Sequence, residues 1–258
     1  MHNGRILFLF LLFTAQFCYA DIRVGNLNQN NDQQFWFEQN INAQINSKWS
    51  FLFHSGERIG DDYRRFWFLR QWVMLEYDCT EFLQKLFCIS KESAFQSFTI
   101  GPSYSKSWSI QGNKNGIRHW ANSDRPGAAA FMTHNWCGWM LRQRLFAEYI
   151  DFVTPHYRNH GIYRHRAILN APWKLTCYQL NPFFSNEWFF REESVKNGIV
   201  IQSGPFYENR LRIGISAQFS KCLAADIWWQ QRANKQLPGS KPLWRKTYQI
   251  GITVNIQN

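Results

Sequence analysis

Residues 248–257 read YQIGITVNIQ, and apolar side chains alternate strictly with polar residues or glycine. One parity holds Tyr248, Ile250, Ile252, Val254 and Ile256, and the other holds Gln249, Gly251, Thr253, Asn255 and Gln257. Because side chains on a β-strand point alternately to opposite faces, this pattern predicts a strand with one apolar and one polar face. The alternation continues for about ten residues, which is longer than the five or six usual in globular sheets. A strand that crosses a membrane needs about 9–11 residues.

Ten other segments alternate in a similar way. The clearest are 35–45, where Gln39 is the one exception, and 210–219. Noisier examples cover about 49–58, 63–77, 95–104, 125–134, 139–149, 162–170, 178–190 and 223–232. Bacterial membrane barrels normally have an even number of strands. We therefore expect about 12 strands (10–12), with the additional strand in Asp21–Asp32 or Cys79–Cys88.

The connections between these segments fall into two classes. Tight turns are expected at 46–48, 135–138, 171–174 and 220–222, and long polar loops at 105–124, 150–161, 191–205 and 233–243. Most of the 13 Trp residues lie near one or the other end of a predicted strand, as in the aromatic girdles of membrane barrels. The pattern favours an all-β fold, a single antiparallel transmembrane β-barrel with short periplasmic turns and long outer loops. The alternative is a secreted soluble β-sandwich that binds glycans through exposed Trp residues.

The first twenty residues have the three parts of a secretory signal peptide. Arg5 precedes an apolar run over residues 6–13, and a small residue, Ala20, ends the segment. The domain organisation is then a signal peptide at 1–20, a polar N-terminal segment at 21–32 and a barrel domain at 33–258. Aromatic residues make up 18% of the chain, which excludes a disordered protein.

Several motifs carry a resemblance to a known family. In chain order they are Arg125-Pro126, LRQRLFAEY at 141–149, YRHR at 163–166, FFSNEWF at 183–189 and NRLRIG at 209–214. They resemble the DUF2490-type family of Gram-negative secreted proteins, and the match spans nearly all of the mature chain. The resemblance implies an outer-membrane β-barrel in the bacterial cell outer membrane, and it implies no activity, substrate or catalytic residue. The chain departs from the general barrel pattern at its end, where Ile256-Gln257-Asn258 replaces a terminal aromatic residue.

If the apolar parity faces lipid, the polar parity must face the lumen, because a charge on the lipid face costs about 2–4 kcal/mol at the midplane. The arginines predicted to face the lumen are Arg58, Arg70, Arg142, Arg144, Arg164, Arg166, Arg210, Arg212 and Arg232. The acidic residues predicted to pair with them are Glu38, Glu148, Glu187 and Asp226. Nine cations against four carboxylates leave a surplus that attracts anions.

Two interpretations of this lumen remain open. In the first, the arginines line a narrow channel for small anionic solutes, since Arg binds carboxylate and phosphate through two parallel hydrogen bonds. In the second, Arg and Glu cross-link the interior and plug the barrel, and the protein has a structural role in the envelope. The formal charge of +11 points to acidic partners, with lipopolysaccharide phosphates near His156, Arg158 and Lys196 as a hypothesis. We expect no nucleic acid partner, because no recognition helix or Lys-rich tail is present.

An outer-membrane lipid hydrolase is a further alternative, but we expect no enzyme. No His has a Ser two residues later, and the adjacent His54 and Ser55 would point to opposite faces of a strand. We expect no cofactor and no metal site, because no Cys-x-x-Cys motif occurs. Cys79 and Cys88 are the candidate pair for an intrachain disulfide. The mature chain has an odd number of cysteines, which leaves a free thiol or a disulfide to a partner molecule.

Overall fold

The computed structural model describes residues 33–60, 65–90, 94–112, 118–153, 159–175, 180–191, 194–196, 199–202, 206–236 and 243–257. The predicted signal peptide (1–20) and polar segment (21–32) lie outside the described residues. Among the described residues, the structure contains no helix that is long and apolar enough to span a membrane.

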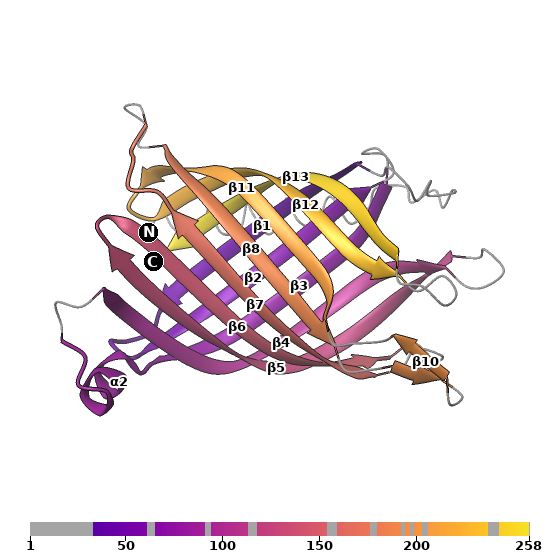
Figure 1. Ribbon diagram of the computed structural model, residues 1–258, viewed down its shortest axis with the longest axis horizontal. Coiled ribbons are helices and arrows are strands. Elements are labelled where there is room, and N and C mark those ends of the chain that lie inside the picture. The colour runs from indigo at the N-terminus through magenta and orange to yellow at the C-terminus, as the bar shows by residue number, and fades with distance from the viewer. Residues whose placement is uncertain are drawn as a thin grey trace.

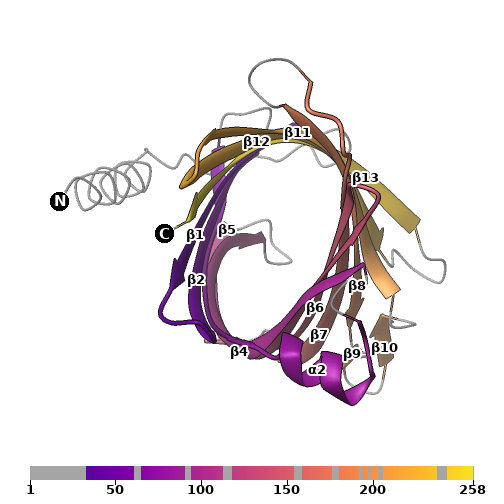
Figure 2. The same ribbon diagram turned by 90° about the vertical axis from the view of Figure 1, so that its left-hand side faces the viewer.

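The chain forms one closed barrel, which Figure 1 shows from the side and Figure 2 nearly along its axis. The barrel strands are β1 (Gln33–Gln44), β2 (Trp49–Gly60), β3 (Arg65–Asp78), β4 (Phe95–Gly112), β5 (Arg118–Trp136), β6 (Trp139–Phe152), β7 (His160–Asn170), β8 (Asn181–Arg191), β11 (Phe206–Ser220), β12 (Leu223–Gln236) and β13 (Leu243–Gln257). Consecutive strands in this series pair antiparallel. The predicted β-barrel is confirmed, and the alternative β-sandwich is excluded.

The described barrel has 11 strands, one fewer than the favoured 12 and within the expected range of 10–12. Each hairpin reverses the chain direction, so an odd number of strands brings the last strand parallel to the first. The barrel accordingly closes through a parallel β1–β13 pair, with Gln33 opposite Tyr248 and Asn42 opposite Gln257. Residues 79–88 contribute the short helix α2 (Thr80–Leu86) instead of a strand.

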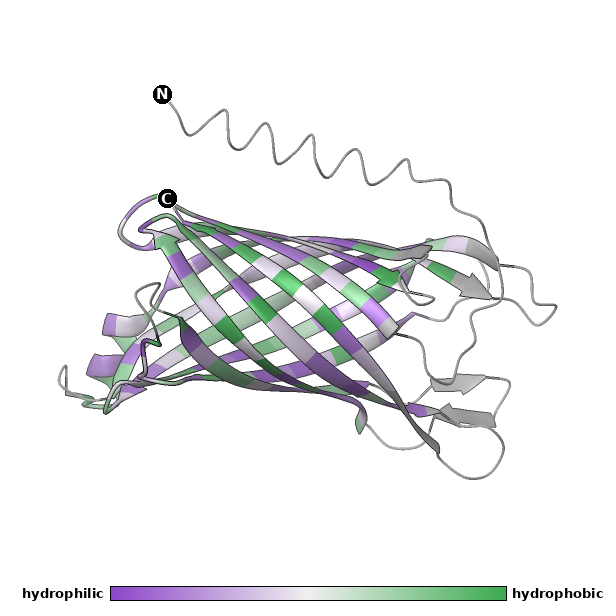
Figure 3. Ribbon diagram, turned by 90° about the horizontal axis from the view of Figure 1, so that it is seen from above, coloured by the Kyte–Doolittle hydropathy of each residue, from purple (hydrophilic) through white to green (hydrophobic). Residues whose placement is uncertain are grey.

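Apolar rows lie on the outer surface of the barrel and polar rows face the lumen. On β13, the side chains of Tyr248 and Ile250 are 47% and 46% exposed, whereas Gln249 between them is 1% exposed. Figure 3 shows the same alternation of hydrophilic and hydrophobic residues along the strands. The period-2 pattern of the sequence thus selects which side chains enter the lumen.

Tight turns gather at one end of the barrel, here called the tight-turn end. Between β5 and β6 the two central residues, Cys137 and Gly138, have φ of 49° and 82°. Positive φ at both positions is the geometry of a type I′ hairpin turn, which matches the twist of the strands. Two further residues, Lys221 and Cys222, connect β11 to β12. The helix α2 lies at the same end (Figure 1).

Several predicted connections differ from the structure. The expected loop at 105–124 is largely strand, because β4 and β5 stay paired until Gly112 meets Arg118. The β5 arm of this hairpin is largely polar on both faces, whereas in the β4 arm Tyr104, Trp108 and Ile110 alternate with serines beyond the end of the predicted strand. Residues 191–205 contain a small hairpin of β9 (Ser194–Lys196) and β10 (Ile199–Gln202). The connection after β7 runs from residue 171 to 180, which is longer than the expected turn at 171–174.

Gly251 on β13 leaves space for two aromatic side chains, one from each neighbouring strand. A Cβ atom at Gly251 would lie 2.3 Å from Cζ2 of Trp228 and 2.7 Å from the carbonyl oxygen of Trp36. The two indole rings meet edge to face with their centroids 5.8 Å apart. Both side chains are nearly fully buried in the lumen. Glycine at this position therefore lets two large aromatic rings pack inside the barrel wall.

Candidate functional site

The structure places the nine predicted arginines on the inner wall of the barrel. Eight of them line two cavities of the lumen, and the ninth, Arg232, forms an ion pair with Glu208 at 2.6 Å. The inward positions follow directly from strand parity, since these residues alternate with the exposed apolar rows.

Two carboxylates on neighbouring parts of the wall each bind several guanidinium groups. Glu148 on β6 forms ion pairs with Arg70 on β3 and with Arg164 on β7, the latter at 3.0 Å. Glu187 on β8 lies 3.1 Å from Arg144, 3.7 Å from Arg210 and 4.0 Å from Arg164. Arg164 therefore links the two carboxylates, and strands from opposite parts of the barrel are joined through the lumen.

Glu208 extends this network along β11, where it binds Arg210 at 2.5 Å and Arg232 at 2.6 Å. Its side chain is 2% exposed. The sequence analysis missed Glu208, although it has the same parity as Arg210 and Arg212. Extending the alternation of 210–219 by two residues toward the N-terminus would have identified it.

A separate pair joins β1 to β11. Glu38 accepts two hydrogen bonds from Arg212, at 3.0 and 3.2 Å, in the bidentate geometry that gives the stronger Arg–carboxylate pairs. Thr253 donates a third hydrogen bond to Glu38 at 2.9 Å, and the indole of Trp228 donates to Thr253 at 2.9 Å. All four groups are buried.

Aromatic rings surround the guanidinium groups. Arg58 lies between the rings of Trp36, at 3.5 Å, and Phe68, at 4.0 Å. Arg212 stacks on Trp228 at 3.6 Å, and the network arginines contact Phe146 and Phe189. Cation–π contacts and ion pairs together offset the loss of water around these buried charges.

The middle of the lumen is consequently filled by side chains. At the end of the barrel opposite the tight-turn end, an apolar cluster lies next to these charged side chains. It consists of Ile150, Ile162 and Phe189, with Phe152 and Tyr207 packed against it. A small cavity of about 60 Å³ remains within the network. We call the arginines and glutamates joined by these ion pairs the arginine plug: Arg70, Arg144, Arg164, Arg210, Arg232, Glu148, Glu187 and Glu208.

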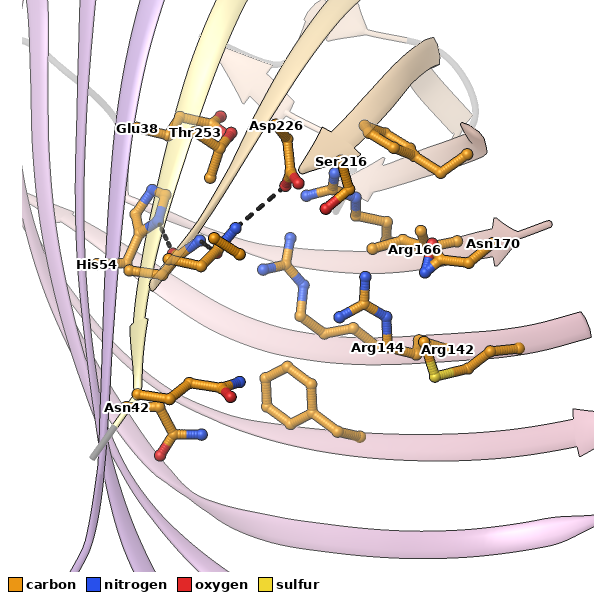
Figure 4. Close-up of a pocket in the computed structure, with 18 of the residues that line it drawn as sticks. Glu38, Asn42, His54, Arg142, Arg144, Arg166, Asn170, Ser216, Asp226 and Thr253 are labelled. Atoms are coloured by element: carbon orange, nitrogen blue, oxygen red, sulfur yellow. Dashed lines mark hydrogen bonds between the residues drawn. The ribbon is translucent and has the colours of Figure 1, made fainter. Parts of the chain in front are cut away.

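A larger cavity of about 590 Å³ lies on the other side of the plug. Its lining includes Asn42, Met140 and Gln257, which are close to the ends of β1, β6 and β13, so it lies toward the tight-turn end. Figure 4 shows Arg142, Arg144 and Arg166 on one side of this cavity, with His54 and Thr253 on the other. Amide side chains from β1, β7, β8 and β13 contribute much of the remaining wall.

Two of the cavity's cations, Arg142 and Arg166, make no direct ion pair within the described residues, although Asp226 attracts the first and Glu187 and Glu38 attract the second. They also form no hydrogen bond with the part of the chain that the structure describes. Arg166 lies between Arg144 and Glu187 in the strand register, yet Glu187 is bound by other arginines. Like charges directly opposite one another on a sheet repel, so Arg144 and Arg166 create a positive potential that faces the cavity.

The remaining predicted site residues are placed as follows. Asp226 lines the cavity but accepts a hydrogen bond from Asn255 at 3.2 Å and forms no ion pair with the described residues. His54 also lines the cavity, and its ring bonds to Asn40 at 2.7 Å. Ser55 follows it on the strand with the opposite parity and is buried. The loop residues His156 and Arg158 and the side chain of Lys196 lie outside the described part of the structure.

The predicted disulfide between Cys79 and Cys88 is not formed, and both thiols are free. The two residues flank α2, whose seven residues at about 1.5 Å of rise each span roughly 10 Å. A disulfide requires Cα atoms within about 7 Å. Cys137 and Cys222 are also free and exposed, at the tips of tight turns. Within the described residues, no three His, Cys, Asp or Glu side chains are grouped so that they could hold a metal ion.

Comparison with known proteins identifies a family. The profile of DUF2490, a family of proteins of unknown function, matches residues 33–241. That range covers most of the described barrel, from the first strand to the end of β12. No curated protein matches the chain. The barrel, with its arginine plug and basic cavity, belongs to the DUF2490 family.

Proposed function

We propose that this protein is an integral outer-membrane β-barrel that binds a small anionic solute in its lumen and does not conduct the solute through the resting barrel. The observation that carries the proposal is the cavity of about 590 Å³, which ends at the arginine plug and contains Arg142 and Arg166, neither of which forms a direct ion pair with the described residues. The fold and the family are compatible with this role.

The outer surface supports a membrane location. Ile213, Ile227 and Ile250 are 50%, 63% and 46% exposed on three neighbouring strands. Trp136 and Trp173, 72% and 57% exposed, lie at the tight-turn end, where amphipathic rings suit a membrane interface. An aqueous surface of this composition would be unusual, because soluble proteins rarely expose contiguous apolar patches larger than a few hundred Å².

The lumen supports binding in preference to conduction. A pore requires a continuous hydrated path, whereas Glu148, Glu187 and Glu208 are 4%, 5% and 2% exposed within the plug. The tight-turn end of an outer-membrane barrel faces the periplasm. A ligand of the cavity would therefore enter from the periplasm.

Two measurements test the membrane and plug parts of the proposal. The protein extracted in detergent should migrate differently on a gel before and after boiling, as closed membrane barrels do. A protein that stays soluble without detergent would contradict the membrane location. In planar bilayers the wild-type barrel should show no stepwise conductance. Steady anion-selective steps, abolished when Arg142 and Arg144 are both changed to Gln, would instead establish a channel.

Binding is tested with inorganic phosphate, titrated calorimetrically into the detergent-solubilised full chain. Arg142→Gln and Arg166→Gln should each weaken phosphate binding about tenfold or more, because a hydrogen bond to a charged group contributes about 1.5–3 kcal/mol. The control is Lys106→Gln, since Lys106 pairs with Asp124 outside the lumen. If wild-type protein binds no phosphate and shows no conductance, the envelope-structure role becomes the better explanation.

A further inference from the structure

The basic cavity also has an apolar wall. Leu52 and Phe131 are half-buried, and they pack against a buried cluster of Trp72, Met74, Ala129 and Phe146. Both residues line the cavity. Their buried sides complete the cluster, and their remaining surface faces the cavity. Apolar area that stays in contact with water in an otherwise polar lumen is available to an apolar part of a ligand.

Apolar side chains lie directly beside the cavity's cations. Phe131 on β5 is the strand partner of Arg144 on β6. Ile168 on β7 is the strand partner of Arg142 on β6. Side chains at directly opposed positions are about 4.5–5.5 Å apart at their Cβ atoms. An anionic group held by these guanidinium groups would therefore lie in a cavity whose wall has apolar side chains next to the stems of the same arginines.

The size of the cavity argues against a simple inorganic ion as its full occupant. A volume of about 590 Å³ lies within the range of roughly 300–1,000 Å³ typical of sites for organic ligands. Such sites combine predominantly apolar walls with a few well-placed polar groups. Here the lining is more polar than that: it carries several arginines, two carboxylates and many amides, and its apolar part is concentrated around Leu52 and Phe131.

We infer that the cavity binds an organic acid, with its carboxylate or phosphate at Arg142 and Arg166 and its apolar body against Leu52 and Phe131. The inference rests on the proposed function, because it assumes that the cavity binds anions. It adds the chemical class of the ligand, an acid with a short acyl or aromatic body.

The test is a ligand series on the wild-type full chain in detergent, followed by calorimetry. Acetate, butyrate and hexanoate carry the same anionic group on chains of increasing length, and hexan-1-ol carries the longest chain without the charge. Each buried methylene should tighten binding about fourfold. Hexanoate should thus bind on the order of a hundredfold more tightly than acetate, and hexan-1-ol should bind more weakly than hexanoate. Phenyl phosphate should likewise bind more tightly than inorganic phosphate.

Two variants assign the effect to the two parts of the cavity. Leu52→Asn should reduce the advantage of hexanoate over acetate at least fivefold. Arg142→Gln should weaken acetate and hexanoate by the same factor. Heat-dependent gel mobility checks that each variant still forms the barrel, and the wild-type series needs no variant at all.

The outcomes separate the inference from the proposed function. Equal binding of acetate and hexanoate overturns the inference and leaves anion binding in place. Hexan-1-ol binding as tightly as hexanoate also overturns it, because the arginines would then play no part. Failure of every anion in the series to bind overturns both statements.

Discussion

Replacing Glu187 by Gln should destabilise the barrel strongly, because this carboxylate joins three arginines. The substitution preserves shape and removes the charge. Arg164 would keep Glu148, and Arg210 would keep Glu208, so both retain a counterion. Arg144 would lose its 3.1 Å ion pair and have no other carboxylate partner in the described structure. One uncompensated buried cation corresponds to the lower end of the 3–5 kcal/mol measured when a buried ion pair is broken.

The expected loss is therefore about 3 kcal/mol in the free energy of unfolding, or about a hundredfold in the equilibrium constant. Urea titration of the protein in lipid vesicles, followed by tryptophan fluorescence, measures it. The control is Glu57→Gln, which removes a carboxylate of similar exposure whose parity on β2 is opposite to that of the lumen-lining Arg58. Glu57 is 7% exposed and Glu187 5% exposed, but Glu57 forms no ion pair within the described residues. Its replacement should change stability by no more than about 0.5 kcal/mol, or increase it, because an amide is less costly to bury than a carboxylate.

The comparison of the two variants shows whether the ion pairs of the arginine plug stabilise the barrel. If Glu187→Gln and Glu57→Gln unfold at the same urea concentration, the arginine plug does not stabilise the barrel. The ion pairs at Glu187 would then be structurally incidental. A new conductance in Glu187→Gln, absent from Glu57→Gln, would show in addition that the plug blocks the lumen.

Two further predictions concern other parts of the barrel. Gly251→Val should destabilise the protein by several kcal/mol in the same urea assay, because the valine side chain would overlap Trp228. The control Gly56→Ala should have a small effect, since the atom nearest to the new methyl group belongs to the movable imidazole of His54, at 3.1 Å. Cys137 and Cys222, exposed at the tight-turn end, should react with a membrane-impermeant maleimide after the outer membrane is permeabilised and not in intact cells; labelling of intact cells would place this end outside the cell.

The sequence predicts the fold well where one face of a strand is apolar. In β13 the alternation from Tyr248 to Gln257 specifies which side chains enter the lumen, and the structure agrees. The outer half of β5 was not predicted because both of its faces are largely polar. The outer half of β4 was not predicted either, although Tyr104, Trp108 and Ile110 alternate with serines there. The total of 11 strands could not be derived from periodicity, since pairing between the first and last strand depends on closure of the whole ring.

The sequence predicts which residues belong to the candidate site but not how they pair with one another. Strand parity selects the inward arginines, but it does not determine which carboxylate each one reaches. Arg166 illustrates this limit, because its strand partner Glu187 binds arginines from β6, β7 and β11 instead. Long side chains cross the lumen, and their pairing depends on distances between strands that are remote in sequence. Which arginines of the cavity remain without a direct ion pair depends on that pairing. The alternation of the sequence cannot predict it.

The parallel seam has a consequence for assembly. Gln34 and Gln249 are joined across it by a side-chain hydrogen bond of 2.6 Å, although 215 positions separate them in the chain. All other neighbouring barrel strands follow one another in the series of barrel strands. In contrast, β1 and β13 are the first and last strands to be synthesised, so no local turn brings them together. Contacts of such large sequence separation form slowly. We expect the joining of these two strands to be the final event of folding, so a chain shortened within β13 should accumulate as an open, unsealed sheet.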